Sequence, residues 1–168
     1  PAAIGYSQAV KVPYHSGLER PTQRRFLDPS VASLVPSGSD FQIRVNKSVV
    51  ENQQVILVVP VLVSGKTARG VVRLIRSAGA IAAHVRIAAP PVKYSGPYGV
   101  LSPTTEELIY RRLPGQDALL AWLGADSVGF LSMEGLRATL NGVDRSTLGW
   151  CETIFTGELP IPTEKIDT

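Results

Sequence analysis

Gly65, Lys66 and Thr67 follow a long apolar run in the stretch VILVVPVLVSGKTARG at residues 55–70. A Gly-Lys-Thr triplet between a strand and a helix is the ending of a P-loop, whose backbone N–H groups and lysine hold nucleotide phosphates. That motif needs another glycine five residues before Gly65, where this chain has Pro60, which has no N–H to donate. The stretch therefore leaves two alternatives: a residual phosphate site, or a plain strand-to-helix turn with Ser64 as the helix N-cap.

Two histidines and one cysteine are the other residues with side chains suited to catalysis or metal binding. His15 lies in a polar loop and is expected to be solvated, whereas His84 lies in an apolar strand pattern and is expected to be a hydrogen-bonded core residue. A single cysteine, Cys151, excludes an internal disulfide and an all-cysteine metal site, and we expect it to be a buried apolar side chain. These residues predict no catalytic group, no metal and no cofactor.

Arginines form two groups in the sequence. One group lies in the proline-rich loop at 13–30 and consists of Arg20, Arg24 and Arg25. Its alternatives are a solvated loop and an interaction site for phosphate or nucleic acid. The other group has helical spacing and consists of Arg69, Arg73 and Arg76. We expect this second group to be a solvated helix face, with docking on RNA or an acidic partner as the alternative.

Hydrophobic periodicity predicts an α/β fold with a mostly parallel sheet flanked by helices. The apolar run at 54–61 predicts a strand covered on both faces, 66–80 an amphipathic helix that ends at Gly79, and 80–90 a second buried strand. Strand, helix and strand in this order form a βαβ unit.

Weaker patterns predict the remaining elements of the chain. A strand is expected at 41–46 and an extended piece at 127–132, while the tail from about 146 to 168 shows no clear period. Helices are expected at 1–10, from Thr104 or Thr105 to 113, at 116–126, and at 133–142, where Asn141-Gly142 would end the last one.

Length and composition are those of a single globular domain over 1–168. The chain has 168 residues, of which 44% are hydrophobic, and a net charge of +3, which permits RNA binding without predicting it. No apolar run reaches the roughly 18–20 residues of a membrane-spanning helix, so we expect no membrane insertion.

Several segments, taken in order, resemble the phosphoribosyltransferase domain of amidophosphoribosyltransferase, the enzyme that opens purine synthesis from phosphoribosyl pyrophosphate. The segments are PAAIGYSQAVKVPYHSGL (1–18), FQIRVN (41–46), VVRLIRSAGAIAAHVRIAAPPVKY (71–94), PYGVLSPTTEEL (97–108), LGADSVGFLSMEGL (123–136) and CETIFTGELP (151–160). The resemblance implies a type I phosphoribosyltransferase fold. It also implies that the family's glutaminase domain and the N-terminal part of the transferase domain are missing from these residues.

Departures from the family pattern fall at the positions that bind substrate. The family strand ends in two aspartates that serve the ribose hydroxyls and the magnesium, where this chain has Val59 and Pro60. In the loop that wraps the ribose 5-phosphate, an arginine has become Ser64, while Gly65 and Thr67 are retained. Lys66 restores one positive charge. The resemblance therefore implies degenerate substrate positions at 59–60 and a residual phosphate site at 64–67.

The lid and the iron–sulfur positions of the family also differ here. Arg20 and Arg24 can be laid on the arginines of the family's flexible lid, but its tyrosine and glycine have become Pro21 and Gln23. Of the positions matching cluster cysteines, Cys151 is retained, whereas the other two are Gly96 and Ile154, and a nearby family aspartate is Leu101. A cluster needs about four thiolates, so none is expected. Asp126, beside Ser127, is retained and is expected to be structural as much as functional.

Two hypotheses of function follow. The first is a non-catalytic structural subunit of a larger assembly, such as a mitochondrial ribosome or respiratory complex, with other protein subunits, a second or related copy, or RNA as partners. Since the chain opens on Pro1 as a cleaved chain would, this hypothesis places it in the mitochondrial matrix, with the cytoplasm as the alternative. The second is a divergent amidophosphoribosyltransferase fragment, or a phosphate- or nucleotide-binding regulator that uses the loop at 64–67.

Overall fold

A three-stranded parallel sheet forms the centre of the molecule. The computed structural model describes residues 1–19, 43–96, 104–140 and 150–159. The strands are β3 (Gln54–Val59), β4 (Ala82–Ile87) and β5 (Ser127–Phe130), in the order β3-β4-β5. This arrangement confirms the predicted mostly parallel sheet, but β3 is shorter than the predicted strand at 54–61. It ends immediately before Pro60, a residue that cannot donate a backbone hydrogen bond to a neighbouring strand.

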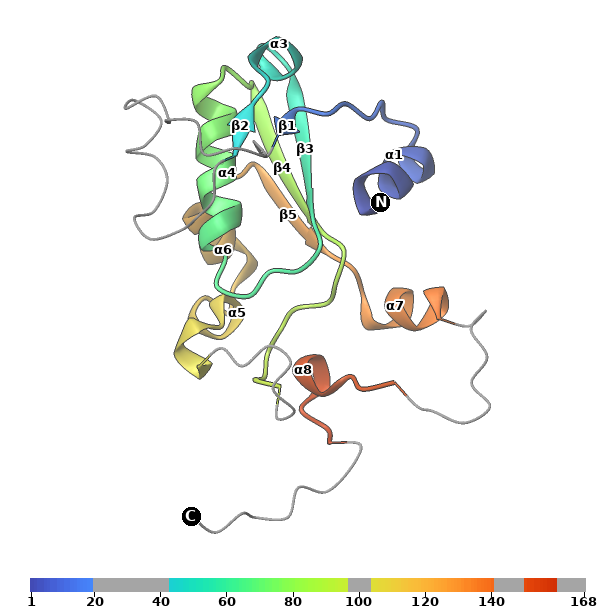
Figure 1. Ribbon diagram of the computed structural model, residues 1–168. Coiled ribbons are helices and arrows are strands. Elements are labelled where there is room, and N and C mark those ends of the chain that lie inside the picture. The colour runs from blue at the N-terminus through green and yellow to red at the C-terminus, as the bar shows by residue number, and fades with distance from the viewer. Residues whose placement is uncertain (20–42, 97–103, 141–149, 160–168) are drawn as a thin grey trace.

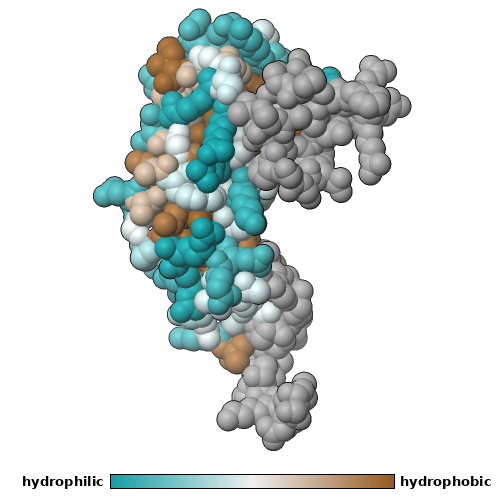
Figure 2. Space-filling model, turned by 90° about the vertical axis from the view of Figure 1, so that its left-hand side faces the viewer, coloured by the Kyte–Doolittle hydropathy of each residue, from teal (hydrophilic) through white to brown (hydrophobic). Residues whose placement is uncertain are grey.

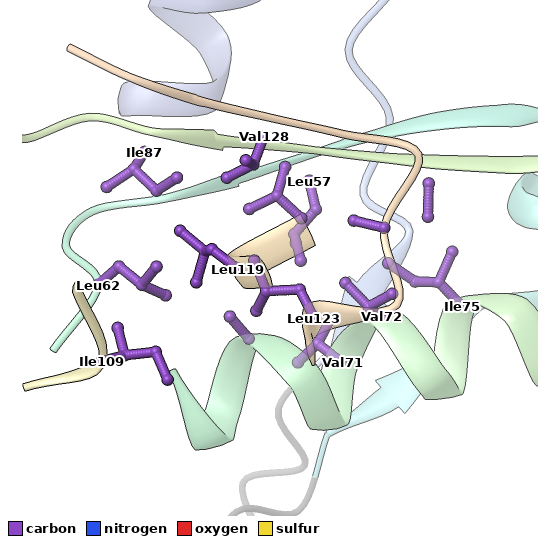
Figure 3. Packing of buried hydrophobic residues seen from close by; sticks show 14 of the residues in the cluster. Leu57, Leu62, Val71, Val72, Ile75, Ile87, Ile109, Leu119, Leu123 and Val128 are labelled. Carbon is purple, nitrogen blue, oxygen red and sulfur yellow. The ribbon is translucent and has the colours of Figure 1, made fainter. Parts of the chain in front are cut away.

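Two helices cover one face of this sheet (Figure 1). They are α4 (Lys66–Ser77) and α6 (Gln116–Leu123). Strand side chains alternate between the two faces, and those that face α4 and α6 are buried or half-buried. Figure 3 shows this core, whose labelled members are Leu57, Leu62, Val71, Val72, Ile75, Ile87, Ile109, Leu119, Leu123 and Val128. Burial of this layer fixes α4 against the sheet and thereby fixes where its N-terminus lies.

Helix α4 is amphipathic, as its sequence predicts. Val71, Val72, Leu74 and Ile75 are buried, and Val72 has no exposed surface. The side of the molecule that carries α4 is mostly hydrophilic, with scattered hydrophobic patches (Figure 2). The helix ends at Ser77 rather than near 80, and Gly79 then adopts a φ of 95°, a left-handed conformation that favours glycine.

The N-terminal elements lie beside the sheet without joining it. Helix α1 (Ala2–Val10) confirms the helix predicted at 1–10. A separate antiparallel pair consists of β1 (Leu18–Glu19) and β2 (Arg44–Val45), and a short helix α3 (Lys47–Val50) follows. The strand predicted at 41–46 is thus only two residues long within the described part. Positions 41 and 42 lie outside the described residues.

The C-terminal half contains several short helical segments. The helix predicted from Thr104 to 113 is divided into a 3-10 turn (Thr105–Glu107) and α5 (Ile109–Arg112), and the Thr104 N–H donates to the Glu107 carboxylate at 3.0 Å. Helix α7 spans Met133–Thr139, and its predicted stop at 141–142 lies outside the described residues.

The tail from about 146 has no clear period in the sequence, but its described part contains a short helix. Helix α8 spans Thr153–Thr156 and ends at Gly157, which has a φ of 84°. The buried Thr153 hydroxyl donates to the Glu158 carbonyl at 2.6 Å, and the Lys93 N–H donates to the Ile154 carbonyl at 2.9 Å. These contacts attach α8 to the segment that follows β4. Among the described residues, no helix is long and apolar enough to span a membrane.

Asp126, which directly precedes β5, connects this strand to helix α4 and to strand β4. Its Oδ2 accepts from the Ala83 N–H at 2.6 Å and from Arg76 Nη2 at 2.7 Å, while Arg76 Nε donates to the Gly124 carbonyl at 2.8 Å. These bonds join the end of α4 to the starts of β4 and β5. The Ala83 N–H, together with the Arg76 guanidinium, holds the pKa of Asp126 below its ordinary value. Asp126 therefore has a structural role, and Arg76 is not simply a solvated residue.

We expect Asp126→Asn to lower the free energy of unfolding at pH 7 by about 1 kcal/mol, a value reduced for the partial exposure of the pair. Because the folded-state pKa is depressed, the carboxylate's contribution is complete at neutral pH and is lost as the pH falls below about 3.8. Urea denaturation of both proteins at pH 7, 5 and 3 should show a difference that shrinks only at the lowest pH. Asp117→Asn, the same change at an exposed position of α6, is the control; an equal loss in both variants would contradict this role.

Candidate phosphate-binding site

The loop between β3 and α4 brings the predicted phosphate residues to the carboxyl edge of the sheet. Leu62 anchors the loop in the core, and the Val63 carbonyl accepts from the Ile109 N–H at 2.9 Å. Gly65, with a φ of 72°, is the N-cap of α4. The prediction of Ser64 as the N-cap was therefore wrong, because the left-handed turn that starts the helix falls on the glycine one residue later.

Trp122 of α6 packs directly on this turn. A Cβ atom on Gly65 would lie 2.8 Å from the indole ring of Trp122, which is closer than packed atoms approach. The Arg69 guanidinium carbon lies 4.7 Å from the centroid of the same ring, within the range of a cation–π contact. Arg69 is therefore held by Trp122 rather than fully solvated. Gly65 is required both by its backbone conformation and by the space that Trp122 leaves.

A hollow of about 360 Å³ lies within the loop. It is lined by Val59, Pro60, Val61, Leu62, Val63, Ser64, Gly65, Thr67 and Ala68. Lys66 is exposed at the first position of α4, and the N–H groups of a first helical turn have no partner within the helix. Hydroxyl groups of Ser64 and Thr67, a lysine charge and the positive end of a helix can together hold a phosphate.

The last residue of β3, Val59, and the residue that follows it, Pro60, have no side-chain atom that could bind a metal. Val59 is half-buried against the core and Pro60 is exposed, and neither has a side-chain oxygen. Magnesium requires oxygen ligands in near-octahedral geometry. Within the described ranges, no group of three or more histidine, cysteine, aspartate or glutamate side chains could hold a metal ion. The described residues 59–68 thus contain no carboxylate side chain.

The structure places both histidines away from this loop. His15 is exposed, as expected, and lines a different groove beside β3. His84 is half-buried, and its Nδ1 lies 2.8 Å from the Ser127 hydroxyl, which confirms a hydrogen-bonded histidine in the sheet.

Cys151 is exposed, so its prediction as a buried apolar side chain was wrong. Thr153, two residues later, is buried instead. The Thr153 hydroxyl lies 3.4 Å from the sulfur and lowers the pKa of the Cys151 thiol.

The remaining arginine predictions have different outcomes. Arg73 is exposed, as expected of a solvated helix face. The interaction arginines Arg20, Arg24 and Arg25 lie outside the described residues, so their role stays a prediction.

Sequence reasoning missed Trp122 and Ile109, which hold the loop from elsewhere in the chain. The sequence carries no signal for such long-range contacts beyond their apolar character.

Comparison with known proteins shows which proteins this chain is related to. No family model matches the chain. It is 36% identical over 167 residues to the amidophosphoribosyltransferase of Mycobacterium bovis, covering 96% of this chain and 31% of that protein. The glutamine phosphoribosylpyrophosphate amidotransferase structure from B. subtilis, complexed with ADP and GMP, superimposes with a TM-score of 0.79 at 36% identity over 98% of this chain.

The chain corresponds to one domain of the amidophosphoribosyltransferases, the phosphoribosyltransferase domain, without the glutaminase domain. The predicted resemblance and the type I phosphoribosyltransferase fold are thereby confirmed. A structure described as the allosteric regulatory enzyme of purine biosynthesis is also similar, with a TM-score of 0.77 at 35% identity over 99% of this chain. The chain spans 31% of the mycobacterial amidophosphoribosyltransferase and 36% of each of the two solved chains.

Gly65→Ala should destabilise this amidophosphoribosyltransferase-family domain more than Gly124→Ala does. Gly124 also has a positive φ, 69°, but no atom lies within 4 Å of the position that a methyl group would take there, whereas Gly65 faces Trp122. The left-handed conformation alone costs about 1–2 kcal/mol in each variant. We expect Gly65→Ala to cost about 1–2 kcal/mol more, because the indole must also move.

Urea denaturation of the two variants measures this difference, and indole fluorescence, recorded with Trp150→Phe in every protein, reports movement of Trp122 in the folded state. Equal stabilities, with the fluorescence of Gly65→Ala unchanged from the parent protein, would show that the indole does not constrain the turn.

Proposed function

We propose that this chain is a divergent amidophosphoribosyltransferase-family domain that binds the phosphate of a phosphoribosyl or nucleotide ligand at residues 64–67 without requiring magnesium. The observation that carries the proposal is the loop after β3. Ser64 and Thr67 line its hollow beside the N-terminus of α4, and Lys66, which is exposed and does not line the hollow, adds a positive charge at the first position of the helix.

Family membership supports the choice of ligands. The B. subtilis structure is named for its phosphoribosyl pyrophosphate substrate and holds ADP and GMP. All three molecules carry phosphate on a ribose, which is the chemistry that a helix N-terminus with a lysine recognises. We therefore take these three molecules as the ligands to test first.

The end of β3 supports binding without phosphoribosyl transfer. A magnesium–diphosphate complex needs carboxylate or other oxygen ligands, and Val59 and Pro60 provide none from their side chains. Metal ions in such reactions neutralise charge that develops on the leaving group, so their loss removes a large part of the catalytic effect. In this proposal the domain keeps the phosphate contact and has lost the transfer chemistry.

The first hypothesis from the sequence, a structural subunit of a larger assembly, gains no support from the fold or the relatives. Its protein partners, pairing with a second copy, RNA binding and mitochondrial matrix location all stay predictions. The family relationship favours the alternative hypothesis, a divergent amidophosphoribosyltransferase with a phosphate-binding loop.

Lys66→Ala should weaken the binding of phosphoribosyl pyrophosphate, ADP or GMP by about tenfold, because one charge-assisted contact of about 1.4 kcal/mol is lost. Isothermal titration calorimetry in EDTA, and again in excess magnesium, measures the affinity. We expect the two conditions to give the same affinity for the parent protein. Lys47→Ala is a matched control, since Lys47 is likewise an exposed lysine at the first position of a helix, α3.

Three results would contradict the proposal. They are the absence of binding by all three ligands, an equal affinity for Lys66→Ala and the parent protein, and a strict requirement for magnesium. Magnesium-dependent formation of phosphoribosylamine from ammonia would show that the chain is an active transferase despite Val59 and Pro60.

A further inference from the structure

The hollow in the loop between β3 and α4 is larger than a phosphate group. Its volume is about 360 Å³. A phosphate has five non-hydrogen atoms and fills roughly 150 Å³, if each atom takes the ~30 Å³ of a water molecule in the liquid. More than half of the hollow therefore remains for the group to which the phosphate is joined, and the lining selects the chemistry of that group.

Apolar side chains form one wall of the hollow. They come from five consecutive residues, Val59, Pro60, Val61, Leu62 and Val63. Leu62 points into the core (Figure 3), but Pro60 and Val61 are exposed, and Val59 and Val63 are half-buried. The four residues other than Leu62 thus present apolar surface that a ligand can remove from water.

The polar part of the hollow offers more hydrogen-bond donors than acceptors. The N–H groups of the first turn of α4 are donors without a partner in the helix, and Lys66 adds an ammonium group nearby. Three carbonyls of the lining, those of Val59, Val63 and Gly65, already accept backbone hydrogen bonds at 2.9 Å. None of the described lining residues has a carboxylate or amide side chain, so the polar part suits an anion rather than a hydroxyl donor.

A sugar hydroxyl group gains little in this hollow. Its proton needs an acceptor, and moving a hydroxyl group out of water without one costs free energy. A hydrocarbon of the same shape needs no acceptor, and each methylene group that covers the apolar wall favours binding. The lining therefore distinguishes two phosphate esters of equal charge by the polarity of their carbon skeletons.

On the basis of the proposed phosphate site, we infer that the hollow binds phosphate monoesters of apolar carbon skeletons in preference to ribose phosphates. The phosphate contacts the first turn of α4, as the proposed function requires, and the carbon skeleton lies along Val59, Pro60, Val61 and Val63. Ribose phosphates still bind through their phosphate, but their hydroxyl groups add nothing to the affinity. The ligand class is thus an alkyl or alicyclic phosphate.

Two esters of matched shape and charge test this ligand class. Cyclopentylmethyl phosphate and ribose 5-phosphate each have a five-membered ring that is joined to the phosphate through one carbon, and only ribose 5-phosphate carries hydroxyl groups. Isothermal titration calorimetry of the full chain in EDTA measures both affinities, with inorganic phosphate as the reference. We expect cyclopentylmethyl phosphate to bind about tenfold more tightly than ribose 5-phosphate, which should bind within about threefold of inorganic phosphate.

A substitution in the apolar wall tests where the carbon skeleton lies. Val61→Ser should weaken the binding of cyclopentylmethyl phosphate about threefold more than that of inorganic phosphate, because it removes apolar surface from the wall. Val12→Ser is the matched control. Val12 is 42% exposed and Val61 36%, both lie outside helices and strands, and Val12 lines a different groove.

Each failure has its own result. Binding of ribose 5-phosphate as tight as that of cyclopentylmethyl phosphate, or tighter, would overturn the proposed ligand class while the phosphate site stands. Equal effects of Val61→Ser and Val12→Ser on cyclopentylmethyl phosphate would overturn it as well, since the carbon skeleton would then lie elsewhere. If neither ester nor inorganic phosphate binds, the proposed function fails, and the ligand class fails with it.

Discussion

The packing of the apolar stripe of α4 on the sheet is the constraint on which the rest of the structure depends. Val71, Val72 and Ile75 bury one side of the helix against the strands, and this burial determines the axis along which its N-terminus points. Because β3 runs directly into this helix through residues 60–65, the same burial places the loop at the carboxyl edge of the sheet. Ligands of open α/β sheets bind at that edge, so the position of the candidate site follows from the core.

Within that frame, the shape of the loop and the chemistry at the end of β3 depend on different residues. Trp122 packs on Gly65 and the Ile109 N–H bonds to Val63, so the turn is maintained by contacts that do not involve substrate. The end of β3 is different, because Val59 has become part of the apolar packing and Pro60 ends the strand. The residues that hold the loop in place are therefore separate from Val59 and Pro60.

The sequence predicted the elements with strong periodicity. Continuous apolar β-branched runs gave β3 and β4, and the amphipathic repeat gave α4, because these patterns reflect burial that each segment determines locally. The short helix α8 was missed because its stability comes from the buried Thr153 and from contacts with the segment after β4. Helix boundaries near Ser64 and Gly79 were displaced by one to a few residues, since the cap depends on backbone angles that many sequences allow.

Residues that act through distant contacts were the hardest to predict at the site. Nothing near Trp122 in the sequence relates it to Gly65, and the role of Asp126 depends on the Ala83 N–H in another strand. The sequence did show that Val59 and Pro60 cannot serve a metal, because this conclusion needs only their chemical identity.

An NMR titration of the uniformly labelled chain with inorganic pyrophosphate in EDTA tests most directly whether the loop binds phosphate without a metal. We expect saturable amide shifts confined to the loop and first turn of α4, at residues 61–68, with Gly65, Lys66 and Thr67 shifting most. Shifts that appear only after magnesium is added, or that lie elsewhere in the chain, would contradict a metal-independent phosphate site at this helix.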